Sequence, residues 1–144
     1  MVFNFGISDI VAILALIVSA LSLKKSSEAT KVSNNISKGQ AEIEIRNMIT
    51  SAKRYYQEKS LALISDPNNA GLQQLVASAL EEVMNTYDEA CAKYLDGKVD
   101  KERFKETYKD EVFNLITDAG VKSKYEGPQS KYKATVTVYE EWKN

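Results

Sequence analysis

The chain has 144 residues, with 19 Lys and Arg against 20 Asp and Glu, no histidine and one cysteine. The lack of histidine removes the commonest general base and metal ligand, and one cysteine cannot form an intrachain disulfide framework. No Gly-rich phosphate loop, Cys pair or Ser-centred elbow occurs. We therefore expect no enzyme, and no catalytic, cofactor-binding or metal-binding residues.

An uncharged stretch, IVAILALIVSALSL, runs from Ile10 to Leu23 between Asp9 and Lys24. A membrane-spanning helix needs about 20 apolar residues, a length reached by counting from Val2. We predict that residues 1–23 form a transmembrane anchor. A cleaved signal peptide would need a basic leading region, which is absent, and a core helix would usually have a polar face. The predicted lipid-contacting residues are Ile10, Val11, Ile13, Leu14, Leu16, Ile17, Leu21 and Leu23.

Charges after this stretch predict its orientation. Lys24 and Lys25 follow the apolar run, whereas no Lys or Arg precedes it. The positive-inside rule therefore places the C-terminal part in the cytoplasm. Residues 24–54 carry seven Lys and Arg against three Glu, and residues 55–144 carry twelve against sixteen acidic residues. The basic segment is too dilute to predict nucleic-acid binding.

Residues 24–40 are rich in Ser and Asn and read as a polar juxtamembrane stalk. Ala29, Val32, Ile36 and Ile43 are near heptad spacing, but Gly39 and Arg46 would occupy the alternate seam positions. A polar helical stalk that continues the anchor is favoured over a coiled coil that dimerises the chain.

Residues 41–144 read as one cytoplasmic helical domain. Apolar residues recur at three- and four-residue steps over 41–64, 72–95 and 104–116, which indicates amphipathic helices. The turn residues of 65–69 separate the first two, Asp100 is a predicted N-cap, and Gly120 is a predicted left-handed stop. The fold class is therefore all-α, with an N-terminal transmembrane helix and long stalk packed on a small antiparallel helical bundle.

The C-terminal segment 131–143 fits two structures. Apolar and polar residues alternate over 131–138 as in a strand, but Tyr132, Val136, Tyr139 and Trp142 also fit one face of a helix. No other segment reads as a partner strand, so a helix is favoured.

Carboxylates and tyrosines are the remaining candidates. Acidic side chains on the predicted helices are interpreted as solvated faces rather than as an acid/base or metal site, and they are Glu81, Glu82, Asp88, Glu89, Asp110 and Glu111. Cys91 lies on an apolar face and is interpreted as a core residue. Five aromatic residues are less well explained by core spacing. A core position is favoured for each taken singly, but as an exposed cluster they would form an interaction surface: Tyr55, Tyr125, Tyr132, Tyr139 and Trp142.

Four segments together resemble a group of small uncharacterised bacterial proteins with one N-terminal membrane helix and a helical cytoplasmic domain. They are ISDIVAILALIVSALSL, KGQAEIEIRNMITSAKRYY, NTYDEACAKYLDGKVDKERFKETYKDEV and YKATVTVYEEW. The resemblance implies a bacterial inner-membrane location and brings no activity or functional residues.

The function hypothesis is a membrane-tethered interaction or scaffolding module of an inner-membrane assembly. Its partners would be membrane lipid and either further copies of the chain or another protein. The alternative is a membrane-active effector or pore component that oligomerises through its anchor, with Ala15 and Ser19 as small packing residues.

Overall fold

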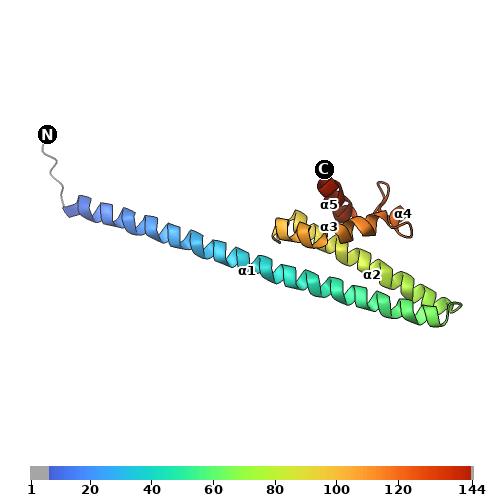
Figure 1. Cartoon of the computed structure of the whole chain (residues 1–144). Coiled ribbons are helices and arrows are strands. Elements are labelled where there is room, and N and C mark those ends of the chain that lie inside the picture. Colours follow the sequence, from blue (N-terminus) through green and yellow to red (C-terminus); the bar gives the residue numbers. More distant parts are fainter. Residues whose placement is uncertain (1–6, 144) are drawn as a thin grey trace. The chain divides into compact units, whose positions relative to one another are not determined.

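The computed structural model describes residues 7–143, with side chains from residue 16 onward, and every regular element in this part of the chain is a helix. The helices are α1 (Ile7–Ser65), α2 (Ala70–Leu95), α3 (Lys101–Thr117), α4 (Lys122–Tyr125) and α5 (Lys133–Lys143) (Figure 1). The all-α class is confirmed, including a helix at the ambiguous C-terminal segment. The predicted antiparallel bundle stays a prediction.

The chain divides into two compact units, Met1–Ser37 and Lys38–Asn144. The first contributes the beginning of α1. The second contains the rest of α1 and the other four helices, and both clusters of buried apolar residues draw their members from residue 41 onward.

Local signals explain where α2 begins and ends. The Asn69 side chain accepts a hydrogen bond of 3.1 Å from the backbone N–H of Leu72, which caps the first turn. At the other end, Gly97 has a φ of 69°, and Lys98 N–H donates to the carbonyl of Lys93 at 3.0 Å. This is a Schellman ending, in which a left-handed residue is needed and glycine meets no steric penalty.

The start of α3 is confirmed and its predicted end is wrong. Asp100 is the N-cap and accepts a hydrogen bond of 3.0 Å from the N–H of Arg103. Gly120 does not have a positive φ. The helix instead ends at Asp118, whose N–H still donates to the Asn114 carbonyl while its own backbone turns extended. The chain leaves α3 without a left-handed residue.

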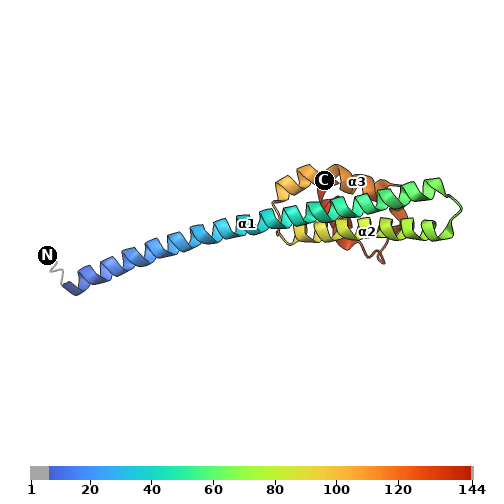
Figure 2. The ribbon, with the colours of Figure 1, turned by 90° about the horizontal axis from the view of Figure 1, so that it is seen from below.

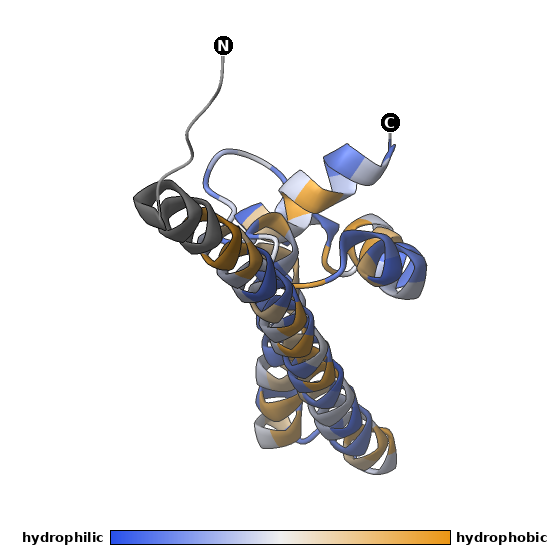
Figure 3. Ribbon diagram, turned by 90° about the vertical axis from the view of Figure 1, so that its left-hand side faces the viewer, coloured by the Kyte–Doolittle hydropathy of each residue, from blue (hydrophilic) through white to orange (hydrophobic). Residues whose placement is uncertain are grey.

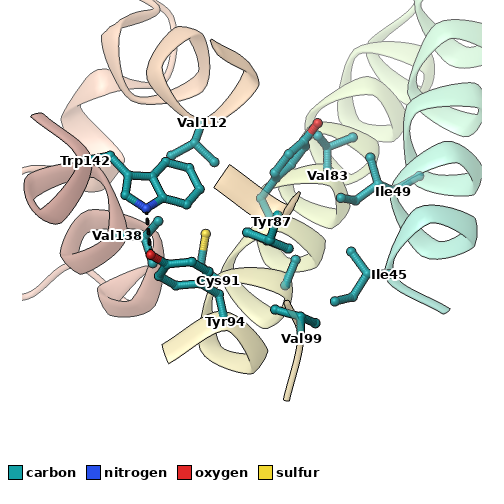
Figure 4. Close-up of a cluster of buried hydrophobic side chains, with 13 residues drawn as sticks. Ile45, Ile49, Val83, Tyr87, Cys91, Tyr94, Val99, Val112, Val138 and Trp142 are labelled. Atoms are coloured by element: carbon teal, nitrogen blue, oxygen red, sulfur yellow. Dashed lines mark hydrogen bonds between the residues drawn. The ribbon is translucent and has the colours of Figure 1, made fainter. Parts of the chain in front are cut away.

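The larger core cluster joins four helices of the second unit. In Figure 4, Ile45 and Ile49 from α1 face the α2 residues Val83 and Tyr87, and Val138 and Trp142 from α5 approach α2 on its other side. Figure 2 shows α2 running back beside the end of α1 after the turn at 66–69. Both faces of α2 are therefore used for packing.

A smaller cluster holds the loop between α4 and α5. It contains Met84 from α2 with Val121, Tyr125 and Tyr132. The rings of Tyr125 and Tyr132 lie 5.1 Å apart between centroids in a tilted arrangement. Such aromatic pairs add to the stabilisation that burial gives, so this cluster fixes the approach of the chain to α5.

The predicted membrane localisation is wrong. Among the described residues no helix combines the length and apolar character that crossing a membrane requires. Asp9 and Lys24 confine the uncharged run to Ile10–Leu23, which is roughly 21 Å of helix against a hydrocarbon core of about 30 Å. This finding argues against the predicted single-pass inner-membrane topology with a cytoplasmic domain. Four predicted anchor side chains lie outside the described residues: Ile10, Val11, Ile13 and Leu14.

Candidate interaction surfaces

All five aromatic candidates belong to the second unit, and four of them are buried or half-buried there. Trp142, Tyr125 and Tyr132 are almost fully buried, and Tyr139 is half-buried against Phe113 of α3. Tyr55 is the only one of the five that is exposed, with 41% of its surface accessible. The structure therefore divides these residues between internal packing and one isolated surface ring.

Trp142 is the centre of an aromatic group. Its ring contacts Tyr94 edge-on at 5.3 Å and Phe104 at 6.1 Å between centroids. Its indole N–H donates to the Tyr94 hydroxyl at 3.0 Å, and that hydroxyl donates to Glu141 at 2.6 Å. Every polar atom of the group therefore has a partner, as buried indole and phenol groups require.

Asp88 does not behave as a solvated surface carboxylate. Its Oδ1 accepts hydrogen bonds from the backbone N–H of Thr135 at 2.9 Å and from the Thr135 hydroxyl at 3.0 Å. Thr135 is fully buried near the start of α5. Asp88 thus supplies, from α2, the acceptor that an N-cap side chain would normally give.

A polar triad joins α1, α2 and α3 in the second unit. Glu111 accepts from Lys53 at 2.8 Å and from the hydroxyl of Tyr87. Burial raises the pKa of Tyr87 above its usual value, and the hydrogen bond to Glu111 raises it further. Tyr87 therefore stays neutral and acts as a donor rather than as a base.

The triad lines a groove with a volume of about 500 Å³. Its wall is mainly apolar and is formed by Tyr56, Leu80, Val83, Leu115 and Val121. Asn114 and Asp118, at the end of α3, complete the polar edge. A volume of this size and a few polar groups among apolar ones are typical of small-molecule sites.

Sequence reasoning missed Asp88 and Glu111 as structural residues. Both stand at the edge of an apolar stripe. Asp88 lies four residues after Met84 and three before Cys91, and Glu111 lies three after Tyr108 and four before Leu115. A carboxylate at such a position faces the boundary of the core, where it can reach a donor on another helix.

The first unit shows a different kind of surface. Its largest apolar side chains are 50–72% exposed, and within residues 16–23 they are Leu16, Ile17, Val18, Leu21 and Leu23. Val32 and Ile36 are exposed to a similar extent. Figure 3 shows hydrophobic colours where the coloured part of α1 begins. Contiguous exposed apolar side chains of this kind are typical of interaction surfaces.

Comparison with known proteins adds no relative: no family model, curated protein or solved structure matches the chain. The resemblance drawn from the sequence therefore remains an expectation.

Cys91 is predicted to be chemically inert in the folded chain. It is fully buried, and burial raises the pKa of its thiol to about 12. Because the thiolate is the nucleophile, iodoacetamide at pH 8 should alkylate the native chain at least about 100-fold more slowly than the urea-unfolded chain. Mass spectrometry of timed samples measures both rates, and equal rates would contradict the burial.

The raised pKa of Cys91 also makes the stability of the fold depend on pH in a defined direction. The unfolded thiol ionises near its ordinary value of 9.0, whereas the folded thiol holds its proton until about pH 12. The unfolded state therefore binds fewer protons between these values, and the contribution of Cys91 to the free energy of unfolding falls as pH rises through this window. A Cys91→Ala variant should show a shallower loss of stability between pH 9 and 12.

Proposed function

We propose that this chain is a protein–protein interaction and scaffolding module. Copies of the chain would associate through the part of α1 that lies in the first unit. The observation that carries the proposal is the exposure of five large apolar side chains within residues 16–23. Burying such side chains in an interface gives about 25 cal/mol per Å² of apolar surface removed from water.

The lack of packing partners for the first unit supports association. Most helical stability in proteins comes from packing an apolar face against another element. Neither core cluster of the described chain includes a residue from the first unit. Partner helices from other copies would supply the missing packing.

The positions of the exposed residues favour more than two copies. At 3.6 residues per turn, Ile17, Val18 and Leu21 occupy one side of the helix, and Leu16 and Leu23 lie roughly opposite them. One neighbouring helix covers only one side. If each copy uses both sides, every helix contacts two neighbours, and such head-to-tail contacts close into rings or extend into filaments, depending on the rotation between copies.

Each copy would then bring its remaining helices, α2 to α5, to the assembly. In this proposal they form the small antiparallel bundle expected from the sequence. Ion pairs tie it to the second part of α1, with Glu42 bonded to Arg103 at 2.9 Å and Glu44 bonded to Lys93 at 3.1 Å. These contacts all lie within the second unit, so each copy would carry the bundle as one folded part.

A paired substitution tests the proposal. Ile17→Gln combined with Leu21→Gln should raise the dissociation constant of the assembly at least tenfold, because two apolar contacts on one side of the helix are lost. Light scattering coupled to gel filtration, over a range of chain concentrations, measures the dissociation constant of the unmodified chain and of the variant.

The matched control lies on the same helix, in the second unit. It combines Leu61→Gln with Ile64→Gln, whose side chains are 65% and 72% exposed. This pair removes the same residue types at comparable exposure and should leave the dissociation constant within about twofold, since surface changes away from a contact have small effects. Equal effects of the two pairs would count against a docking surface in the first unit.

A further inference from the structure

The groove that the triad lines is formed by residues of the second unit, and the proposed association does not use it. It combines an apolar wall with a polar edge at one end of α3. Leu80 and Leu115 in its wall are half-buried, so each keeps part of its apolar surface open. That open surface is available to an apolar group of a ligand.

The charges along the polar edge do not cancel. Lys53 and Glu111 form an ion pair at 2.8 Å, which neutralises both. Asp118 has no ion-pair partner among the described residues, and its Oδ1 is held by the N–H of Gly120 at 2.8 Å. The edge therefore carries a net negative charge at an exposed carboxylate that accepts one backbone hydrogen bond.

The end of α3 adds to this negative potential. The carbonyl groups in the last turn of a helix carry partial negative charge, and a basic residue there usually offsets it. The last turn of α3 contains no basic residue. An anion would meet this potential and would have to displace Glu111 from Lys53, whereas a cation would be attracted.

We propose that the groove binds a small organic cation, a primary ammonium group joined to an apolar chain or ring. The ammonium group would pair with the Asp118 carboxylate at the end of α3. The apolar part would lie against Leu80 and Leu115. This inference is independent of the association through α1, because the groove is lined by residues of the second unit.

The test uses the full chain and two probes that differ in charge, 2-phenylethylammonium and 3-phenylpropionate. Saturation-transfer NMR titrations give the dissociation constant of each. We expect the ammonium probe to bind at least fivefold more tightly than the carboxylate. Asp118→Asn should raise the dissociation constant of the ammonium probe at least fivefold, because asparagine retains the acceptor oxygen for Gly120 but not the charge.

Two further variants separate charge recognition from folding. Asp96 is the C-cap of α2 and lies outside the groove lining, so Asp96→Asn should leave the dissociation constant within twofold. Leu80→Ala should weaken the ammonium probe by removing part of the apolar wall, and circular dichroism verifies that each variant is folded. Equal binding of both probes, no binding of either, or unchanged affinity in Asp118→Asn would overturn the proposal.

Discussion

Replacing Trp142 by alanine is expected to lower the free energy of unfolding by about 3–5 kcal/mol, the range for deleting a large aromatic side chain from a core. Trp142 is 3% exposed and contacts both Tyr94 and Phe104. The substitution also removes the donor to the Tyr94 hydroxyl. Because Trp142 is the only tryptophan, urea unfolding should be followed by far-ultraviolet circular dichroism rather than by its fluorescence.

Tyr55→Ala is the matched control for this variant. Tyr55 is an aromatic residue with 41% of its surface exposed, so its loss should change the free energy of unfolding by about 0.5 kcal/mol or less. Trp142→Phe should fall between the two, because it keeps part of the ring contact. A loss below about 1 kcal/mol in Trp142→Ala would contradict the packing of α5.

Replacing Asp88 by alanine is expected to cost about 2–3 kcal/mol, because it leaves two buried donors of Thr135 without an acceptor. Capping side chains that are lost from helix starts have costs of similar size. Asp88→Asn keeps an acceptor oxygen and should cost less. Urea unfolding of the three chains measures the differences.

Glu89→Ala controls for the loss of a carboxylate from the same helix. Glu89 is next to Asp88 but is more exposed and forms an ion pair of 3.2 Å with Lys93. Exposed pairs of this kind contribute about 1 kcal/mol or less. If Asp88→Ala and Glu89→Ala lost the same stability, the cap on α5 would have no energetic role.

Helices and their ends were largely predictable because their signals are local. Apolar spacing gave the buried faces that contain Val83, Tyr87 and Val112, and turn chemistry gave the break between α1 and α2. Asp100 could be recognised as a cap from its neighbours alone. Such patterns depend on residues within one or two helical turns.

Contacts between helices were not predictable in the same way. The pairing of Asp88 with Thr135 joins residues 47 positions apart, and the pairing of Tyr87 with Glu111 joins residues 24 apart. No periodic pattern specifies which helices meet. Glu111 and Asp88 were therefore interpreted as solvated carboxylates, although each bonds a donor on another helix.

The aromatic residues near the C-terminus illustrate the same limit. Their spacing favoured a helix, and the helix is present as α5. Spacing could not show that Trp142 would meet Tyr94 and Phe104, because that contact depends on how the chain returns from α4. Burial of these rings followed from tertiary packing rather than from local sequence.

Sedimentation equilibrium of the unmodified full chain tests the central claim most directly. The chain has a mass of 16.1 kDa. Association through two sides of α1 predicts a concentration-dependent mass that reaches at least three times this value, because each helix would contact two neighbours. A measured mass equal to that of a single chain at every concentration would contradict the proposal that α1 assembles copies of this protein.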